Sequence, residues 1–583
     1  MTRLITAVAI AATLAACGRE AATPKEGAAS AARRAVPGIV LVTVEGWSDP
    51  KAPADPFTAS SLPGSVRLDD AMTPCPQIRP AVVAMLTGAN PDRSGVRDDL
   101  SLPLPSDAAF LPEALSKQGW QTAAFVANPQ VGVGSGLERG FDIFDAPREP
   151  PFGPFRYLPS VRPAAEVLKN FGSWATSLSP DRPFFAWVQL TGGGPVGEIK
   201  GQAPGLAAAW TDLSARLASD AGLKDVSVLV VGVSGAIDVS DGLRSGYFLQ
   251  PSVLRIPFLY RSRKGAEPQP GERALAASAD VAAVVARDAS IDFTAADGRV
   301  PWASGGETRV RFGWTWRGAR EFGWPVQAAA VIGSTLYVRE RDGDPDRMLA
   351  WGAPKAADAP AVDGAALMRA LERRPAWAEP RQSPAPAIPV AMQASLRASK
   401  VAIPTAAKLP PAIPIALRAA EIPGLMKARS IATQGQPEAA GAFDGARNGD
   451  PGNIGARVEA GQILALIGRA KKAREQLEPA LHLDPYRAAT WHWLGHVSFL
   501  ENDHAKAETM WRLSELLDPH DADVLYDLAC VRSLAGDPAT SAQYLRRAWE
   551  GGFRNPEKIQ SDPDLRNLRE SPRFAAFMSE VVR

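Results

Sequence analysis

The stretch Gly38-Ile-Val-Leu-Val-Thr-Val44 is a continuous apolar run that is rich in β-branched residues. A run of this kind predicts a strand that is buried on both faces, as in a parallel sheet. Similar runs recur further along the chain, at 122–127, 184–188 and 226–233. Helical patterns lie between them, as at 111–118, which Gly119 closes. Strands that alternate with helices indicate a doubly wound α/β domain, which we place at residues 37–355.

The chain changes character after this domain. Pro-Ala-Pro-Ala-Ile-Pro at 384–389 and Lys-Leu-Pro-Pro-Ala-Ile-Pro at 408–414 favour extended, semi-rigid backbone. We therefore interpret residues 356–450 as a Pro/Ala-rich linker, with short helices near 365–372 and 415–420.

The last part of the chain is repetitive. Leu483-Asp484-Pro485 returns 34 residues later as Leu517-Asp518-Pro519. Together with Trp491 and Gly495 at matching spacings, this period resembles the tetratricopeptide helix pair. Small residues stand where two helices of such a pair would cross closely, at 461, 473, 495, 507 and 529. The resemblance implies an all-α solenoid at 451–553, and residues 554–583 would cap its last repeat.

A second resemblance lies between Ala71 and Asp99. Cys75-Pro-Gln-Ile-Arg-Pro-Ala-Val-Val-Ala-Met-Leu-Thr-Gly88, followed by Asn90-Pro-Asp-Arg-Ser-Gly-Val96, is similar to the nucleophile region of sulfatases in the alkaline-phosphatase superfamily. Further matches follow in the family's order, at 119–126, 136–142, 182–188 and 253–258. The resemblance implies the family's α/β fold. It also implies a Ser, Thr or modified Cys that attacks sulfur or phosphorus beside metal ions.

The nucleophile position of that family is filled by an apolar side chain in this sequence. A gapless match through Thr87-Gly88 places Ile78 at the nucleophile and Val82 at the basic residue four positions on. Isoleucine has no group that it could donate to a sulfur or phosphorus centre. The sequence therefore predicts a domain with the frame of a hydrolase and without its attacking group.

The metal-binding positions are depleted in the same way. Glu45 remains at the end of the first strand, Gln189 stands at the end of the 184–188 strand, and Gly235 and Ala236 replace the second metal motif. All five histidines lie between 482 and 520, so the first 450 residues contain none. Divalent ions need several convergent oxygen or nitrogen ligands, and these positions do not supply them. We expect no metal, no cofactor and no catalysis.

A rival alignment keeps Cys75 and Arg79 at the spacing of the sulfatase signature, in which the Cys is oxidised to formylglycine. It would make the chain an active sulfuric-ester hydrolase, and a phosphoester hydrolase with atypical ligands is a further alternative. A third possibility is a cleft lined by Arg79, Glu45 and Gln189, with Asp238 and Asp241, that binds an anionic glycan without cleaving it.

In tetratricopeptide proteins the first helix of each pair lines a concave groove. By position, this resemblance assigns seven residues to the groove: Val458, Gln462, His492, His496, Phe499, Tyr526 and Cys530. We expect a protein or peptide partner there. Two alternatives stay open. The four-residue spacing of His492 and His496 could serve a metal, although no further ligand is evident. The repeats could also pack only on their own α/β domain.

The N-terminus reads as an export signal. A basic start and an apolar stretch end in Leu14-Ala-Ala-Cys17, which resembles the lipobox of bacterial lipoproteins. Acylation of Cys17 would anchor the chain to a membrane through a tether at 18–36. Gly18 then favours the periplasmic face of the outer membrane. The alternative is an ordinary cleaved signal over residues 1–17.

The remaining composition excludes other classes of function. The net charge is +1, which does not favour nucleic acid as a partner. Three cysteines, one of them Cys17, do not indicate a disulfide framework.

Overall fold

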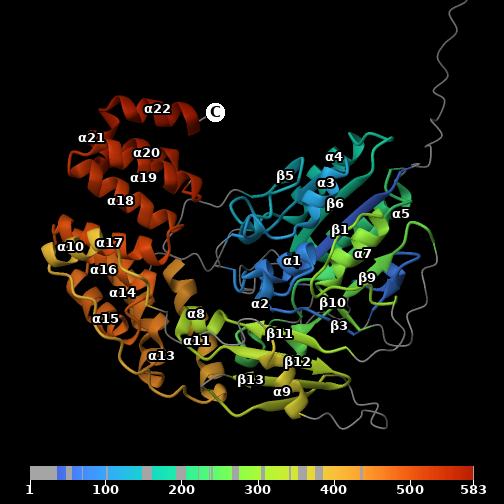
Figure 1. Ribbon diagram of the computed structural model, residues 1–583, viewed down its shortest axis with the longest axis horizontal. Coiled ribbons are helices and arrows are strands. Elements are labelled where there is room, and N and C mark those ends of the chain that lie inside the picture. Colours follow the sequence, from blue (N-terminus) through green and yellow to red (C-terminus); the bar gives the residue numbers. More distant parts are fainter. Residues whose placement is uncertain are drawn as a thin grey trace, which may run out of the picture.

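A computed structural model describes most of the chain (Figure 1). The described residues are 36–46, 56–68, 70–99, 103–147, 161–191, 205–220, 222–235, 237, 241–265, 275–303, 309–340, 343–351, 364–374, 385–433, 438–553 and 555–581. We call 36–374 the sheet half and 385–581 the helical half. Cys17, with the segments expected as signal and tether, lies outside the described residues.

The sheet half is built on a seven-stranded mixed sheet in the order β2-β9-β7-β1-β6-β4-β5. Its strands are β1 (Gly38–Glu45), β2 (Val66–Arg67), β4 (Gln121–Phe125), β5 (Ile143–Asp145), β6 (Phe184–Thr191), β7 (Ser227–Gly232) and β9 (Phe258–Arg261). The five from β7 to β5 run parallel, whereas β9 and β2 add antiparallel pairs at one edge. All eight residues of β1 are buried, as its unbroken apolar run predicts.

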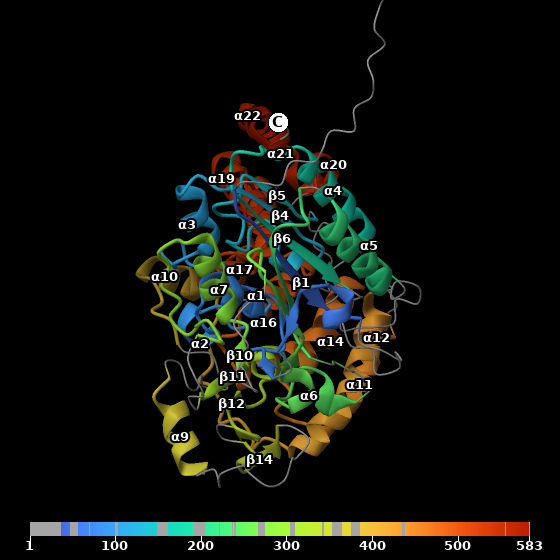
Figure 2. The ribbon, with the colours of Figure 1, turned by 90° about the vertical axis from the view of Figure 1, so that its right-hand side faces the viewer.

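Helices cover both faces of this sheet (Figure 2). One face packs against α1 (Ile78–Thr87), α3 (Leu111–Lys117) and α7 (Asp280–Ala289), and the other packs against α4 (Ala164–Thr176) and α5 (Gly205–Ser219). The expected layering of helices on both sides of a central sheet is therefore present. Short elements complete this part: α2 (Pro91–Ser94), α6 (Pro251–Leu254), η1 (Ala59–Ser61), η2 (Pro129–Val131) and η3 (Gly242–Arg244).

Two smaller sheets extend the sheet half. One is an antiparallel meander of β11 (Arg311–Thr315), β12 (Gln327–Ile332), β13 (Thr335–Glu340) and β14 (Arg347–Ala350). The other pairs β10 (Ala276–Ala277), β3 (Ala71–Met72) and β8 (Arg255–Ile256). Helix α8 (Arg317–Phe322) joins β11 to β12 and reaches towards the helical half (Figure 1).

The helical half contains three successive antiparallel helix pairs. They are α14 (Ile454–Leu466) with α15 (Ala470–Leu483), α16 (Ala488–Leu500) with α17 (His504–Leu517), and α18 (Ala522–Leu534) with α19 (Pro538–Glu550). Gly461 and Gly495 stand at the crossings: a Cβ there would lie 2.6 Å from Leu477 Cγ and from Trp511 Cδ1, respectively. The sequence had predicted close crossings at these two positions, and the helices approach as expected.

The chain ends in short helices that pack on the third pair. They are α20 (Pro556–Ser561), η4 (Pro563–Leu565), α21 (Arg566–Arg569) and α22 (Pro572–Val581). Leu565, Leu568 and Phe577 enter the same core as Leu525 and Leu545.

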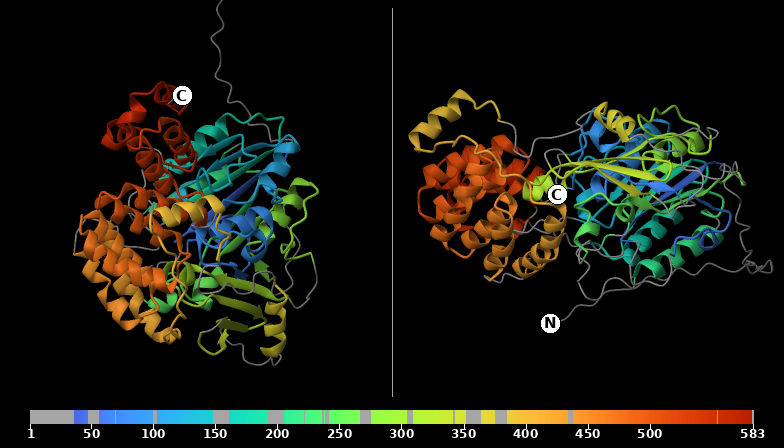
Figure 3. Two further views of the ribbon diagram at one scale, coloured as in Figure 1. Left: turned by 60° about the vertical axis from the view of Figure 1, so that its left-hand side comes forward. Right: turned by 90° about the horizontal axis from the view of Figure 1, so that it is seen from below.

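The interpretation of 356–450 as a linker needs correction. Helix α9 (Gly364–Glu372) packs on the β11–β14 sheet through Leu367 and Leu371. Helix α10 (Val390–Ala398) lies against α17, and α11 (Ile415–Thr433), α12 (Ala439–Ala442) and α13 (Asp444–Gly449) belong to one core with Tyr247 and Trp324 of the sheet half. The proline content of this segment favours extended backbone. Its apolar residues are nevertheless buried, on helices that pack against both halves. The two halves are therefore joined by a continuous core, and they lie side by side in Figure 3.

No helix within the described ranges combines the length and the apolar character that a bilayer crossing requires.

Candidate functional site

Polar side chains gather at the carboxyl edge of the main sheet, on the face that α1 covers. β1, β4 and β6 are parallel, so their carboxyl ends lie together. Glu45 closes β1 and Gln189 lies near the end of β6. Both share a face with the apolar residues that pack on α1, because side chains alternate along a strand. Open α/β sheets place their ligands at this edge.

Glu45 is held by a side chain that the analysis of the sequence did not single out. Asn128 Nδ2 donates to Glu45 Oε2 at 3.1 Å, and Asn128 Oδ1 accepts from the backbone N–H of Gln130 at 2.9 Å. Burial raises the pKa of Glu45 from 4.5 to about 7, with Asp99 adding to the rise and Asn128 opposing it. Near neutral pH a large share of Glu45 is therefore the uncharged acid.

Gln189 links two strand ends. Its Oε1 accepts from the backbone N–H groups of Ala127 at 3.1 Å and Asn128 at 3.0 Å. Its Nε2 is buried and has no hydrogen-bond partner among the residues that the structure describes. The oxygen that could bind a metal is thus already used to fix the β4 end against β6.

The N-terminus of α1 lies beside these groups. Asp99 Oδ1 accepts from the backbone N–H of Arg79 at 2.9 Å, and Arg79 Nε donates to Gln130 O at 2.6 Å. Cys75 is fully buried, with its Sγ 3.6 Å from Gln77 Oε1. Burial, together with the charge of Asp99, raises the pKa of the Cys75 thiol. This environment disfavours the thiolate, which is the nucleophilic form of cysteine.

The positions expected to carry catalysis are packed into the fold. Ile78 and Val82 are buried in the core between α1 and the sheet. Gly235 has no room for a side chain, because a Cβ there would lie 2.0 Å from Ser252 O. A carboxylate ligand at position 235 would require the backbone around 252–255 to move. Ala236 lies outside the described residues.

Among the described residues, the groups at this edge do not fit a divalent ion. Within the described ranges, no group of three or more His, Cys, Asp or Glu side chains is arranged to hold one. The oxygens nearest the edge already accept from N–H donors: Glu45 from Asn128, Gln189 from two backbone amides, and Asp99 from Arg79. A cation there would have to displace these hydrogen bonds without gaining a complete set of ligands.

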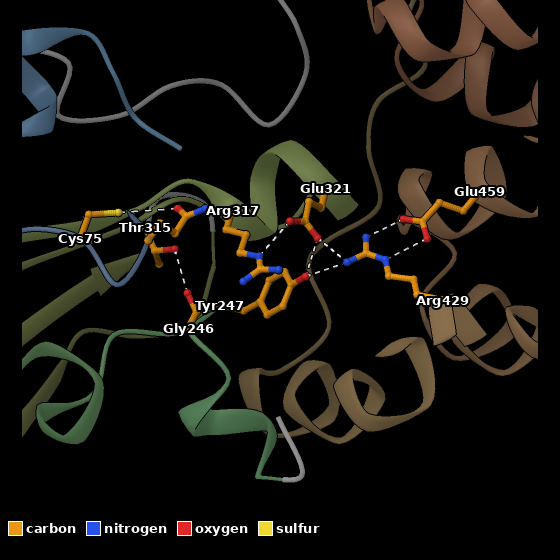
Figure 4. A network of polar contacts seen from close by, with 9 residues as sticks. Cys75, Gly246, Tyr247, Thr315, Arg317, Glu321, Arg429 and Glu459 are labelled. Atoms are coloured by element: carbon orange, nitrogen blue, oxygen red, sulfur yellow. Dashed lines mark hydrogen bonds and ion pairs between the residues drawn. The ribbon is translucent and has the colours of Figure 1, made fainter. Parts of the chain in front are cut away.

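A chain of buried charges runs from this edge to the helical half (Figure 4). Arg317 Nε in α8 donates to Glu321 Oε1 at 2.8 Å, and the guanidinium lies 4.3 Å from the centre of the Tyr247 ring. Arg429 Nη1 in α11 donates to Glu321 Oε2 at 2.7 Å, and the Tyr247 hydroxyl donates to the same oxygen. Arg429 Nη2 then donates to Glu459 Oε1 in α14 at 2.6 Å.

Glu321 is kept ionised by the two guanidinium groups of this chain, whereas burial raises the pKa of Glu459 although Arg429 opposes the rise. Burial alone would raise the pKa of Glu321, but Arg317 and Arg429 lower it from 4.5 to about 2. The pKa of Arg429 is raised, because the nearby carboxylates outweigh burial. Asp99, which accepts from Arg79 at the N-terminus of α1, is among the groups that raise the pKa of Arg317. We call Arg317, Tyr247, Glu321, Arg429 and Glu459 the interface chain.

Other contacts close the same interface. Trp324 Nε1 donates to Asp450 Oδ2 at 2.8 Å, and Arg487 Nη1 donates to Arg320 O. Gly455 of α14 lies directly against α8, since a Cβ there would be 1.8 Å from Glu321 O. The first helix pair therefore packs on its own sheet half.

The seven expected groove residues do not form one open surface. Val458, Gln462 and Cys530 are buried, and Tyr526 is covered by Phe553, whose ring centre lies 4.1 Å away. In the middle pair, His492 Nε2 lies 3.0 Å from Asp527 Oδ2, which ties α16 to α18. His496 and Phe499 are partly exposed. The C-terminal segment that covers Tyr526 follows the repeats, and no feature of the repeat pattern predicts its position.

Sequence patterns did not reveal Asn128, Asp99 or the interface chain. Asn128 is 83 residues from Glu45, and Arg429 is 182 residues from Tyr247. No local spacing connects such pairs. One signal was available: Asp98-Asp99 follows the stretch that resembles the nucleophile region, and a carboxylate beside a helix N-terminus is stabilised there.

A scan against protein-family models found no match, and a search of curated proteins found no relative. The solved structures that resemble this chain match its N-terminal half. A 2-O GAG sulfatase is 13% identical, with a TM-score of 0.39 over 54% of this chain and 85% of its own. A protein solved with its substrate D-glucosamine-2-N,6-O-disulfate is 12% identical, with a TM-score of 0.42 over 54% and 91%. The phosphonate monoester hydrolase of Agrobacterium radiobacter is 12% identical, with a TM-score of 0.40 over 54% and 89%.

Proposed function

We propose that this chain is a cell-envelope lipoprotein whose sulfatase-like half does not catalyse hydrolysis and whose tetratricopeptide half binds a protein or peptide. Its role would be that of a scaffold or recruiter. Acylated Cys17 would hold it at a membrane, on the periplasmic face of the outer membrane. Nucleic acid is not expected as a partner.

One observation supports the proposal that this half is not catalytic. Ile78, which stands at the expected nucleophile position, is buried in the hydrophobic core. Ile78 packs between α1 and the sheet, and the backbone at Gly235 is pressed against Ser252 O. A polar nucleophile or a carboxylate ligand would disturb packing at both places. Residues whose present role is structural are consistent with a fold that is kept for its shape.

The interface chain supports a scaffold role. Five buried side chains and a shared apolar core hold the repeats to the sheet half. A rigid connection would hold the repeats in a fixed position relative to the sheet half. We assign recognition of the partner to the partly exposed His496 and Phe499 of α16.

Metal analysis of the purified chain, with turnover of aryl sulfate and phosphate esters, tests the proposal. We expect substoichiometric divalent metal and no hydrolysis. One stoichiometric ion per chain, whose removal abolishes hydrolysis, would refute the non-catalytic assignment.

The anchor is tested separately: Cys17→Ser should release the chain from envelope membranes, and continued membrane association would refute acylation at Cys17.

Mass spectrometry of the peptide that contains Cys75 distinguishes our proposal from the alternative of an active sulfatase. We expect an unmodified thiol, and an aldehyde at this position would favour an active enzyme. The glycan-binding alternative has less support, because Arg79 already donates to Gln130 O and its neighbour Asp99 is acidic. A glycan-array signal that Arg79→Ala abolishes would restore that alternative.

Recognition of a partner is best tested in the full chain. Removing 451–583 would leave the core around α11 exposed, because Ala456, Ala460 and Ile463 of α14 complete it. Cross-linking in envelope extracts should instead yield one reproducible partner that Phe499→Glu loses. A matched control is Val133→Glu, which changes an exposed apolar residue of the sheet half. Equal loss in both variants, or in neither, would count against the groove.

A further inference from the structure

Exposed apolar side chains recur at one position of the three helix pairs. Among the described residues, the large hydrophobic side chains with substantial exposure include Leu466 (44%), Ile467 (40%), Leu500 (40%) and Leu534 (37%). The three leucines end α14, α16 and α18 and stand 34 residues apart. We call these four residues the leucine row.

The leucine row lies along one edge of the helical half. Each leucine is followed two residues later by a backbone turn with positive φ, at Gly468 (72°), Asn502 (61°) and Gly536 (75°). The same local geometry at the same repeat position places the leucines on equivalent ends of neighbouring helices. Packed helices are about 8–10 Å apart, so the row spans roughly 20 Å. Single exposed leucines are ordinary, but a repeated row is a feature of contact surfaces.

The charges beside the row differ from one end to the other. The residue three positions after each leucine is Arg469 in the first pair, Asp503 in the second and Asp537 in the third. Asp503 and Asp537 cap α17 and α19 by accepting from the backbone N–H groups of Lys506 and Thr540. Read along the row, the charge order is therefore positive, negative, negative.

We propose that the leucine row is a self-association surface, on which a second copy of this chain docks about a twofold axis through Leu500. Antiparallel rows place Leu466 of each copy opposite Leu534 of the other, and Leu500 opposite itself. Arg469 then faces Asp537 at both ends, and only this order brings opposite charges together. Twofold dimers are the commonest protein assemblies, and their interface uses the same patch twice.

The middle of the row contains one unfavourable contact. Asp503 lies next to the axis, so the two copies would bring like charges together. A row of this size is smaller than a typical stable interface. The dimer should therefore be weak, with a dissociation constant of about 1–100 µM. Removing a negative charge should therefore weaken the dimer at Asp537 and strengthen it at Asp503.

Sedimentation equilibrium of the full chain carrying Cys17→Ser, which leaves no thiol for acylation, tests this arrangement. Leu500→Asp should weaken the dimer at least ~10-fold, because each interface would bury two unpaired charges. Asp537→Asn should weaken it about 3-fold, whereas Asp503→Asn should tighten it about 3-fold. Asparagine retains the helix cap, so these two substitutions remove charge without removing the capping hydrogen bond.

Val133→Asp is the control, since Val133 is exposed (62%) and lies in the sheet half. It should leave the dissociation constant unchanged. A monomer at all concentrations would overturn the proposal, as would a dimer that Leu500→Asp does not weaken. If both asparagine variants shift the constant in the same direction, the antiparallel register is wrong.

Discussion

Two buried glutamates in this chain have opposite electrostatic behaviour. Glu45 lies at the carboxyl edge of the main sheet with an amide as its hydrogen-bond donor, and burial raises its pKa to about 7. Glu321 lies between two guanidinium groups in the interface chain, and its pKa falls to about 2 despite burial. Burial acts to raise the pKa of both, and at Glu321 the two guanidinium groups outweigh it.

This difference separates the roles of the two regions. In the interface chain, hydrogen bonds between two guanidinium groups and two buried carboxyl groups link α8, α11 and α14. The pKa of Glu321 falls there, whereas burial raises that of Glu459. Where no cation is paired with the carboxylate, the acid tends towards its neutral form. The described part of the sheet edge therefore favours a neutral acid at Glu45, whereas the interface chain holds charged groups in a hydrogen-bonded network.

Breaking the paired region should have the largest effect. Glu321→Gln leaves Arg317 and Arg429 buried without their shared carboxylate, which should destabilise the fold by about 3–5 kcal/mol. Urea unfolding measured by circular dichroism would show it, with the two halves unfolding in separate steps. Glu570→Gln, in an exposed ion pair with Arg566, serves as the control and should leave the midpoint unchanged. A loss below about 1 kcal/mol would mean that the interface chain contributes little to the joint between the halves.

Neutralising Glu45 should instead increase the stability of the fold, by an amount that depends on pH. Glu45 binds its proton more tightly in the folded chain, so its contribution to stability is complete below pH 4.5 and is lost as the pH rises to about 7. Glu45→Gln removes this loss. The variant should match the parent near pH 4 and exceed it by about 3 kcal/mol near pH 8. Denaturant unfolding at the two pH values measures the difference, and an equal or lower stability of the variant near pH 8 would contradict the raised pKa.

Space at the sheet edge gives a third test. Gly235→Ala brings a Cβ to 2.0 Å from Ser252 O and 2.6 Å from Arg255 O, both backbone atoms. The backbone must move, which should destabilise the fold by about 1–3 kcal/mol. Gly222→Ala is the matched control, because nothing lies within 4 Å of its added Cβ. If thermal unfolding shows equal melting temperatures for both variants, position 235 could accommodate a side chain and our argument against a ligand there fails.

The sequence predicted those parts of the fold that local patterns encode. The apolar run at 38–44 is β1, the helix expected at 111–118 is α3, and the 34-residue period corresponds to three helix pairs. Within 356–450 the helices expected near 365–372 and 415–420 are present as α9 and the start of α11. The burial of this segment was not predicted, because Ile422, Leu425 and Met426 of α11 gain their partners from the sheet half and from α14. Composition records the prolines of this segment but not the surface that buries its apolar residues.

The same limit applies to the candidate site. Glu45, Ile78 and Gln189 were identified because a family pattern fixes their positions, and each lies at or beside the carboxyl edge of the sheet or in the core beneath α1. Asn128 and Arg317 were not, since their importance comes from contacts between segments far apart in the chain. Tyr526 and Cys530 were assigned to an open groove, whereas the structure buries both beneath the C-terminal segment.

The smallest expected effect on stability concerns the contact between His492 and Asp527. Here burial and a single opposite charge act on the pKa of His492 in opposite directions. His492 Nε2 lies 3.0 Å from Asp527 Oδ2, and that hydrogen bond raises the pKa of His492 although burial acts against it. A raised histidine pKa contributes stability that is complete below pH 6.5 and is lost as the pH rises through the folded value.

Asp527→Asn keeps an acceptor of similar size and removes the charge. It should reduce the free energy of unfolding by about 1 kcal/mol near pH 6, and the difference should shrink near pH 9, where the imidazole is neutral in both proteins. NMR titration of the His492 ring measures its pKa directly. A His492 pKa that does not fall in the variant would show that Asp527 is not the group that favours the protonated form. The reversal of the burial effect that two cations produce at Glu321 would then have no counterpart at this contact.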